Sequence, residues 1–550
     1  MLRRAGPSAG GESWLWLGAA AVTVSLVAVL LVLLLIATRG LEHFWPAPLD
    51  ALVIEAADGS ELRLLGAIVD EERVPTDTLT AAGPAGDTQQ RLLLHKANRD
   101  LGGPDFRWVD ARAIRNVSRP RDAVVLERVA WGRAQGYLVD RRLSEEDDDA
   151  RASEEDDDVG ASAPSWARLQ SALRRADEGR REIDRLRRTV LAPADRNLTR
   201  LGQDRPGGRP PSDRERSEAR ESAADARARL AALQSALARD SVVLELADGS
   251  RHEIALQDVL RAWRPNRMDT LDRLGFALAE GRRFLTEAPR EANTEGGVAP
   301  AIFGTVLLVL LMALLVTPLG VLAAIYLHEY APGGPGVRLL RIAVSNLAAV
   351  PSIVYGVFGL GFFVYLAGGS VDALLYSDTL PAPTFGAPGL LWAALTLALL
   401  TLPVVVVSTE EGLARIPRDL RDGSLALGAT RSETLTRIVL PAALPAILTG
   451  VILAVARAAG EVAPLMLVGV VKLAPSLPVD GSFPFLHLDR QFMHLGFHVY
   501  DLGFQSPNVE AARPLLFATA LLLVLLISAL NLSAVLLRSR LDARYGPADL

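Results

Sequence analysis

The sequence predicts an all-α membrane protein of about six transmembrane helices, into which an α+β extracytoplasmic domain is inserted. Half of its 550 residues are hydrophobic while 22% are charged, and one chain accommodates both fractions only when the two kinds of residue are segregated along it. Apolar residues gather in six runs, and a run of roughly 20 apolar residues is enough to cross a bilayer. The runs cover residues 14–37, 298–327, 339–366, 389–408, 442–470 and 514–537.

The first run, 14–37, resembles a secretion signal in its position and composition. Its apolar core is longer than that of a signal peptide, and no small-x-small cleavage site follows it in 36–39. We interpret residues 1–40 as an N-terminal tip followed by a retained membrane anchor. The sequence contains no cysteine, which excludes disulfides, thiolate metal sites and cysteine nucleophiles.

Arginine placement predicts the orientation, because short loops rich in Lys and Arg stay in the cytoplasm. Basic residues at 3–4, 338–341, 415–437 and 538–544 all fall on the same side when the runs are counted through. The loop 367–388 carries neither Lys nor Arg and falls on the other side. We therefore expect both termini to be cytoplasmic.

Between the first two runs lies a polar region, 41–297, which the same count places outside the cytoplasm. Two of its segments, 52–64 and 242–250, alternate apolar and polar residues around an Asp-Gly pair, a pattern that predicts β-hairpins. Further strand candidates are 106–114 and 123–139. We expect a small β domain assembled from both ends of the region.

Two insertions separate those ends. Copies of Ser-Glu-Glu-Asp-Asp-Asp begin at Ser144 and Ser153, within an acidic linker at 144–158. Calcium binds clusters of carboxylates, but consecutive acids repel each other and no Gly-hinged loop is present to surround an ion, so a solvated linker is favoured. Leucines and alanines at three- and four-residue spacing then predict a helical hairpin at about 163–240, and its interspersed acids argue against nucleic-acid binding.

Several kinds of chemistry are absent from the sequence. Lys96 and Lys472 are the two lysines, and neither follows a glycine as the phosphate-binding Gly-Lys-Ser/Thr loop requires. No His-Glu-x-x-His motif occurs, and the seven histidines form no ligand-like cluster. We expect no ATP hydrolysis by such a loop, no metal site and no cofactor bound by this chain.

The polar segment 410–441 lies between the fourth and fifth apolar runs. Within it, Ser424–Leu427 is expected to be helical, Gly428 lets the chain turn sharply after that helix, and Pro441 is expected to open the next helix. A short rigid helix at the cytoplasmic face suits a surface held by another protein, while an ordinary charged loop is the alternative. The candidate coupling residues are Asp422, Gly423, Ser424, Leu425, Gly428, Ile438, Leu440 and Pro441.

Arg457 and Glu461 are four residues apart within the fifth run, and therefore on one face of the expected helix. A lone charge in lipid is costly, so both side chains are expected to face the protein interior or a water-filled path. They are candidates for an anion pathway or its gate, and a structural ion pair is the alternative. Pro351 and Pro464 would free backbone groups, which is tolerated where helices pack together or line a cavity.

From about residue 298 onwards, ordered motifs resemble the PstA family, the permease subunits of phosphate-specific ABC importers. The motifs are AIYLHEYA at 324–331, VPSIVYGVFGL at 350–360, LALGATR and VLPAALP at 425–431 and 439–445, and RAAGEVAPL at 457–465. His328 departs from the family pattern, and Asp422-Gly423 stands where ABC importer permeases usually have Glu-Ala. Glycine at that place weakens a helix by roughly 1 kcal/mol relative to alanine.

The resemblance implies an ABC type I importer permease in the bacterial inner membrane. Its partners would be a related permease (PstC-like), an ATPase dimer (PstB-like) that uses the ATP, a periplasmic phosphate-binding protein (PstS-like) and the lipid bilayer, with no nucleic acid. Segment 422–441 would contact the ATPase. The implied path or gate residues are Arg457, Glu461, Pro351, Ser352 and Tyr355. Two alternatives stay open: a permease for another oxyanion, such as sulfate or molybdate, and a non-transporting membrane sensor or scaffold.

Overall fold

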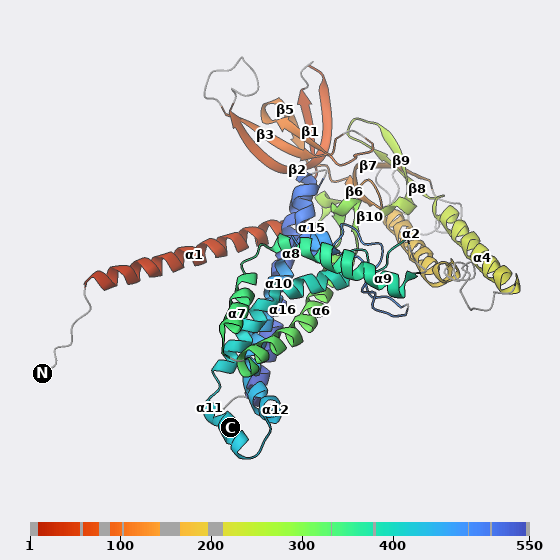
Figure 1. The fold of residues 1–550 in the computed structure, drawn as a ribbon. Coiled ribbons are helices and arrows are strands. Elements are labelled where there is room, and N and C mark those ends of the chain that lie inside the picture. Colours follow the sequence, from red (N-terminus) through yellow and green to blue (C-terminus); the bar gives the residue numbers. More distant parts are fainter. Residues whose placement is uncertain are drawn as a thin grey trace. The chain divides into compact units, whose positions relative to one another are not determined.

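A computed structural model describes residues 9–55, 59–75, 88–101, 104–142, 166–195, 213–331, 333–377, 381–481, 483–506 and 509–545 (Figure 1). The chain divides into two compact units. We call Met1–Phe44 together with Leu278–Leu550 the helical unit, and Trp45–Ala277 the β-rich unit. The acidic repeats at 144–158, the first eight residues and the last five residues, 546–550, lie outside the described residues.

Within the described residues, six helices are long and apolar enough to cross a membrane, which confirms the predicted number. These helices are Trp16–Glu42, Ala299–Tyr330, Ser352–Leu375, Leu390–Ala414, Arg431–Gly460 and Ala512–Arg540. Their ends differ from the predicted ends in the third and fifth spans, as described with the candidate site below.

The helical unit consists of one long helix at each end of the chain and several shorter helices between them. Its α-helices are α1 (Ala9–Glu42), α6 (Ala299–Ile325), α7 (Pro335–Leu347), α8 (Ser352–Phe358), α9 (Gly369–Leu375), α10 (Leu390–Ala414), α11 (Arg418–Ala426), α12 (Arg431–Thr434), α13 (Leu440–Gly460), α14 (Leu465–Val468), α15 (Leu495–Tyr500) and α16 (Val509–Tyr545). π-helical turns continue several of them, at Tyr326–Tyr330, Gly359–Gly368, Leu435–Val439 and Asp501–Gln505.

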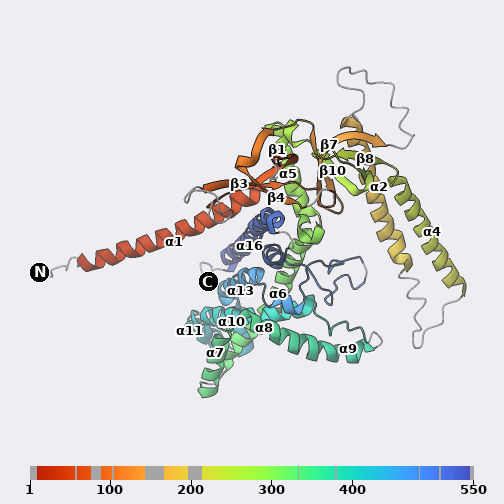
Figure 2. The same cartoon turned by 90° about the horizontal axis from the view of Figure 1, so that it is seen from above.

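Helix α10 lies against both α6 and α13 and contributes much of the main apolar core (Figure 2). Small residues allow these helices to approach closely. A methyl group in place of the Gly320 hydrogen would lie 2.7 Å from Val405, and one on Gly450 would lie 2.8 Å from Cβ of Ser408. The Ser408 hydroxyl donates to the carbonyl of Ala446 at 2.8 Å, which ties α10 to α13 directly. Small residues and hydroxyl bonds of this kind are typical of helices that pack within a membrane.

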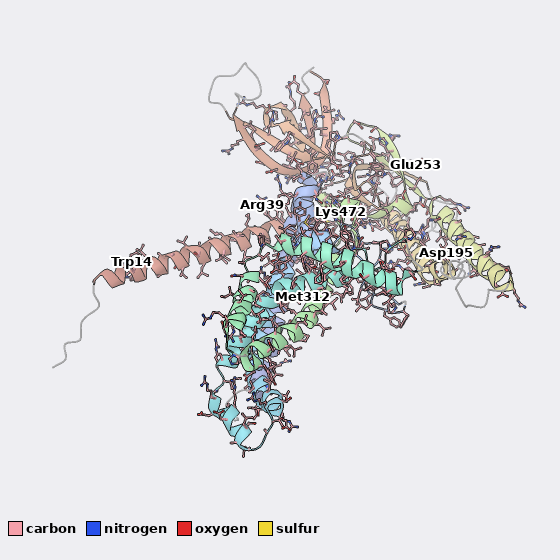
Figure 3. All side chains as sticks on the ribbon, in the orientation of Figure 1. Trp14, Arg39, Asp195, Glu253, Met312 and Lys472 are labelled. Atoms are coloured by element: carbon pink, nitrogen blue, oxygen red, sulfur yellow. The ribbon has the colours of Figure 1, made fainter. Side chains whose placement is uncertain are left out.

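Helix α1 is packed differently. The most apolar 18-residue part of its span has no buried residue, and Figure 3 shows side chains standing out along the helix between Trp14 and Arg39. Its last turn packs on α16, where a methyl group on Gly40 would lie 2.9 Å from the carbonyl oxygen of Phe517. An apolar helix with so little protein around it needs lipid or another chain as its surroundings.

The β-rich unit contains two five-stranded antiparallel sheets (Figure 2). The first, in the order β4-β3-β2-β1-β5, consists of β1 (Asp50–Glu55), β2 (Glu61–Pro75), β3 (Thr88–His95), β4 (Phe106–Asp110) and β5 (Ile114–Ser118). The second, in the order β10-β6-β7-β8-β9, consists of β6 (Ala123–Arg128), β7 (Arg133–Arg142), β8 (Ser241–Glu245), β9 (Arg251–Ala255) and β10 (Val259–Trp263).

Both predicted hairpins are present. Leu52 in β1 pairs with Leu64 in β2, and Val242 in β8 pairs with Ile254 in β9, so the alternating apolar residues face the same side of each pair. Strand β7 pairs with β8 across the long segment that separates them in the sequence. The second sheet is therefore assembled from both ends of the region.

Two helices of this unit, α2 (Trp166–Leu186) and α4 (Asp213–Leu237), occupy the range of the predicted hairpin and contact each other. The buried side of α2 also packs on the second sheet, where Leu169 and Leu173 join Leu244 in one apolar cluster. Arg180 holds α2 in place by donating to the carbonyls of Gln257 and Val259 at 3.1 and 2.9 Å.

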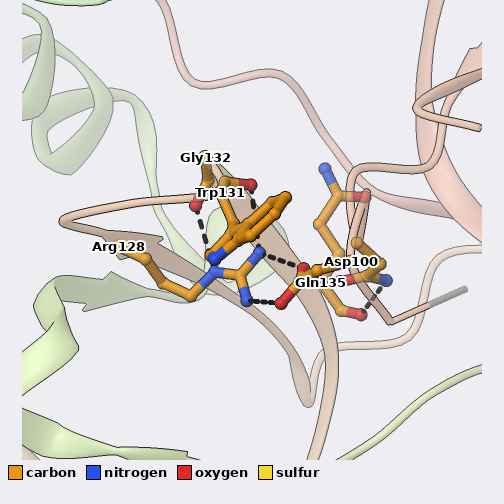
Figure 4. A network of polar contacts seen from close by, with 6 residues as sticks. Asp100, Arg128, Trp131, Gly132 and Gln135 are labelled. Atoms are coloured by element: carbon orange, nitrogen blue, oxygen red, sulfur yellow. Dashed lines mark hydrogen bonds and ion pairs between the residues drawn. The ribbon is translucent and has the colours of Figure 1, made fainter. Parts of the chain in front are cut away.

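A polar network fixes the turn between β6 and β7 (Figure 4). Arg128 is buried and donates two hydrogen bonds to the carboxylate of Asp100, at 2.8 and 2.6 Å. The same guanidinium donates to the carbonyls of Trp131 and Gly132, at 3.0 and 3.2 Å. A buried charge needs such complete pairing. The bonds from Arg128 also hold two residues of the turn that have positive φ, Trp131 at 69° and Gly132 at 72°.

Candidate functional site

The predicted coupling segment forms the short helix α11, which ends in a Schellman motif. The Gly428 N–H donates to the carbonyl of Leu425 at 3.0 Å, and the Ala429 N–H donates to that of Ser424 at 3.2 Å. Gly428 has a φ of 88°, a conformation that glycine adopts without the steric cost of a Cβ atom. The sharp turn predicted at Gly428 is therefore confirmed.

The helix that follows begins earlier than predicted. Thr430 and Glu433 form a capping box, in which the Thr430 N–H donates to the Glu433 carboxylate at 2.9 Å and the Glu433 N–H donates to the Thr430 hydroxyl at 3.2 Å. The chain continues as a helix from Arg431 to Gly460. Pro441 is the second residue of α13, as predicted for a proline that opens a helix, and a π turn, Leu435–Val439, joins α13 to the helical turn that starts at Arg431.

Polar contacts attach α11 to the bundle. Arg421 donates to the carbonyl of Leu413 at 2.8 Å and lies 3.1 Å from the carboxylate of Glu329, which follows α6. The two charged side chains are 20% and 22% exposed, so solvent screens their interaction only partly. A push on α11 would therefore reach both α10 and the end of α6.

The candidate coupling residues fall into an exposed and a buried set. Asp422, Gly423, Leu425 and Gly428 are exposed. Ser424 is buried and shares a 2.9 Å hydrogen bond with the hydroxyl of Thr434, and Ile438, Leu440 and Pro441 are half-buried. The exposed set is accessible to another protein, and the remaining residues join it to the helices behind.

The third apolar run, predicted at 339–366, does not form one span. It is divided between α7, which ends at Leu347, and a second helix that begins at Ser352 and reaches Leu375. Pro351 causes the break, since it has no N–H to donate and restricts the residue before it to an extended conformation.

Tyr355 closes this break. It is 4% exposed, and its hydroxyl donates to the carbonyl of Leu347 at 2.6 Å. That carbonyl is the last of α7 and also accepts from the N–H of Val350 at 3.2 Å. Pro351 is exposed at the start of α8, and Ser352 beside it is half-buried.

Two motifs that are far apart in the sequence lie against each other. A methyl group in place of the Gly356 hydrogen would be 2.7 Å from Cα of Pro464, which is closer than any side chain tolerates. The glycine of the 350–360 motif therefore lets α8 pack directly on the start of α14. The sequence contains both motifs but carries no signal that they meet.

Arg457 and Glu461 form an ion pair, with 3.5 Å between Nε and Oε1 and side chains 35% and 20% exposed. The prediction that the fifth span continues to residue 470 with both charges on one helical face is wrong. Helix α13 ends at Gly460, and Glu461 is already extended, with a ψ of 132°. Gly460 favours a helix end and Pro464 prevents the helix from continuing.

These contacts gather three of the five predicted path residues into one neighbourhood. Tyr355 packs in one apolar cluster with Ala458, the neighbour of Arg457 in α13, and Glu461 pairs with the Arg457 guanidinium. Pro351 and Ser352 lie at the start of the helix that carries Tyr355.

A second polar cluster was not predicted. The Lys472 ammonium, labelled in Figure 3, lies 3.0 Å from the carboxylate of Asp501, and the Asn293 amide donates to the same carboxylate oxygen at 3.0 Å. Asp501 and Asn293 are 1% exposed. Burial also lowers the pKa of the nearby His494 and His498 to about 4, so both rings are neutral at pH 7. No spacing in the sequence relates residues so far apart.

Six apolar helices with internal breaks and polar residues at those breaks define a multi-span membrane protein. The chain belongs to the family of binding-protein-dependent transport system inner membrane components, whose sequence profile matches residues 316–546. It is therefore an inner-membrane permease component of an ABC importer, and a transporter subunit rather than an enzyme.

Individual relatives share about a third of the aligned residues. The probable ABC transporter permease YqgH of Bacillus subtilis is 35% identical over 36% of this chain and 61% of its own length. The phosphate transport permease PstA of Mycobacterium leprae is 36% identical over 43% of this chain and 69% of its own length. The phosphate transport permease PstA of Yersinia pestis is 34% identical over 47% of this chain and 77% of its own length. These matches confirm the resemblance to PstA permeases.

Among solved structures, the inward-facing MetNI methionine ABC transporter is similar to 44% of this chain and 95% of its own chain, with 18% identity and a TM-score of 0.34. The structural similarity is weak, and the family assignment rests on the sequence.

Proposed function

We propose that this chain is the permease subunit of an ATP-driven importer of inorganic phosphate. The observation that supports the cargo best is the contact between Gly356 and Pro464, because it joins the two motifs that most resemble phosphate permeases. Several similar relatives also carry names that describe phosphate transport. Together with a second, related permease, the chain forms the translocation path.

Arg457 and Glu461 act in this proposal as a gate within the path. Arg457 attracts the phosphate oxyanion, and Glu461, which pairs with it at 3.5 Å, competes with the anion so that phosphate is released. Tyr355, Pro351 and Ser352 shape the wall beside the pair, at the break between α7 and α8.

A separate ATPase dimer drives the cycle in this proposal. It contacts the exposed face of α11, and its movement reaches the bundle through Arg421 and Ser424, which are bonded to Glu329 and Thr434. The chain itself binds no cofactor, since the ATP is used by the partner. A periplasmic phosphate-binding protein delivers the cargo.

Uptake by liposomes that contain the co-purified complex tests the cargo and the gate together. We expect ATP-dependent accumulation of labelled phosphate that excess sulfate or molybdate does not reduce. Arg457→Ala should abolish accumulation while the complex still assembles. Arg540→Ala, which alters an exposed arginine at the end of the last span, outside the coupling segment, is the matched control and should leave uptake in place.

Other outcomes favour the alternatives. Competition by sulfate or molybdate would indicate a permease for another oxyanion. Unchanged uptake and ATPase coupling in Arg457→Ala and in a variant with a disrupted Gly428 turn would indicate a sensor or scaffold that does not itself transport.

A further inference from the structure

Helix α5 (Thr270–Thr286) begins in the last residues of the β-rich unit, continues into the helical unit and carries an apolar stripe. The stripe consists of Leu271, Leu274, Leu278 and Leu285, which are 76%, 49%, 69% and 46% exposed. At 100° per residue these four positions fall within an arc of about 60°. Exposed leucines scattered singly are ordinary, but four on one line form a face that requires a partner.

Another side of α5, about 110° from the centre of the stripe, already has its contacts. Phe284 is 5% exposed and packs with Val298 and Ala301 at the start of α6. Its ring also lies 5.4 Å, between centroids, from that of Phe44, just beyond the end of α1. The leucine stripe is therefore a second apolar face, in addition to the one that attaches the helix.

These contacts place the end of α5 at the membrane surface. The chain leaves the bilayer at the end of the first span, Glu42, and enters it again at Ala299, so both points lie on the same side. Phe284 touches the chain at both points. Backbone hydrogen bonds fix the junction further, from the N–H of Val298 to the carbonyl of Phe284 at 2.8 Å and from that of Ala299 to the carbonyl of Glu287 at 3.1 Å.

We propose that α5 is an interfacial helix, whose leucine stripe inserts into the lipid headgroup region where the chain enters its second span. The occupant of the stripe is the bilayer surface rather than another protein. Helices of this kind combine an apolar stripe with basic residues beside it. Arg282 is exposed at the edge of the stripe, about 20° from Leu271 around the helix, where its long side chain can reach the phosphate groups of lipids.

The absence of cysteine makes a direct test possible, because a single introduced cysteine can be labelled without removing any other. The full-length chain would carry a spin label at Leu271→Cys, Leu274→Cys, Leu278→Cys or Leu285→Cys in nanodiscs of phosphatidylethanolamine and phosphatidylglycerol. Asp272→Cys and Ala279→Cys are matched controls, since both positions are exposed and lie about 110–130° away from the centre of the stripe.

The measured quantity is the accessibility of each label to oxygen, which concentrates in lipid, relative to a water-soluble nickel chelate. We expect a severalfold higher ratio at the four leucine positions than at the two controls, both for the chain alone and for the chain with its co-purified partners. Equal ratios at all six positions would overturn the proposal. Labels at the leucines that neither reagent reaches would also overturn it, because a protein would then cover the stripe.

Discussion

Gly423 and Gly428 belong to the same coupling segment but are subject to different constraints. Gly423 lies inside α11, and a methyl group added to it would meet no other atom within 4 Å. Gly428 also has space around it, yet its φ of 88° lies in the region that side chains with a Cβ atom avoid. Space alone therefore does not decide which glycine can be replaced.

We predict opposite effects for Gly423→Ala and Gly428→Ala. The first should raise the free energy of unfolding by up to about 1 kcal/mol, because alanine favours a helix. The second should lower it by about 1–2 kcal/mol through the left-handed backbone conformation. Thermal unfolding in detergent measures both variants. A thermal midpoint that falls equally in both variants would contradict the assignment of strain to Gly428. ATPase stimulation in the complex is a separate measurement, which shows whether the altered turn also weakens coupling.

At the same scale, the buried histidines predict a pH dependence of stability. The pKa of His498 is about 4 in the folded protein and 6.5 when exposed to solvent, so the unfolded chain binds the proton first. The contribution of the buried neutral ring to the free energy of unfolding is complete above pH 6.5 and is lost as the pH falls from 6.5 towards 4. Between pH 7 and pH 5 one such histidine accounts for about 2 kcal/mol.

His498→Gln should therefore lose less stability than the parent protein between pH 7 and pH 5, as measured by thermal unfolding at both values. His494 has the same lowered pKa and remains in the variant, so part of the dependence should persist. His43→Gln, which alters a histidine outside the buried cluster, serves as the control. An unchanged difference between the two pH values in His498→Gln would show that this ring is not buried in its neutral form.

At the scale of helices and strands, hydropathy and turn residues predict which elements exist, and local backbone chemistry decides where they end. All six apolar helices and both hairpins could be predicted from the sequence. The differences lie at Pro351 and Gly460, where an apolar run continues past the end of a helix, and at Arg431, where helical structure starts before the fifth run does. A hydropathy profile cannot distinguish these cases, because proline scores the same wherever it occurs. Pro351 lies at a break between two helices, whereas Pro441 follows a π turn within a continuous helical stretch.

In the candidate site, too, local contacts could be predicted from the sequence and tertiary contacts could not. Arg457 and Glu461 could be paired from their spacing, since that pairing is local in the sequence. The contact of Gly356 with Pro464 and the cluster around Asp501 depend on tertiary packing, and no sequence period encodes them.

The attachment of α11 leads to a prediction for the whole element. Arg421→Ala removes the ion pair with Glu329 and the hydrogen bond to Leu413, leaving a poorly exposed carboxylate without its charge partner. We expect a loss of about 1–3 kcal/mol in stability, together with ATP hydrolysis that no longer drives uptake. Arg415→Ala is the matched control, because that arginine is 81% exposed and 3.9 Å from Glu411. Equal effects of the two substitutions would rule out an anchoring role for Arg421.

For the whole molecule, the division into two units has consequences for folding. The β-rich unit, Trp45–Ala277, is one continuous segment between the first span and the rest of the helical unit. It has apolar clusters of its own, one around Leu126 and Leu244 and another around Leu49 and Trp263. A continuous segment with its own cores meets the physical requirements of a domain that folds independently.

We therefore predict that the segment Trp45–Ala277, produced without the spans, folds into a soluble protein with a single cooperative thermal transition. Circular dichroism follows the transition, and dispersed amide signals in an NMR spectrum check for fixed packing. Leu244→Ala should lower the midpoint, because truncating a fully buried leucine costs about 2–5 kcal/mol. Leu271→Ala, at an exposed position of α5, should leave the midpoint nearly unchanged and is the matched control. A broad, non-cooperative transition that is insensitive to Leu244→Ala would mean that the β-rich unit depends on the helical unit for its fold, and its sheets would then have to form after the spans are in the membrane.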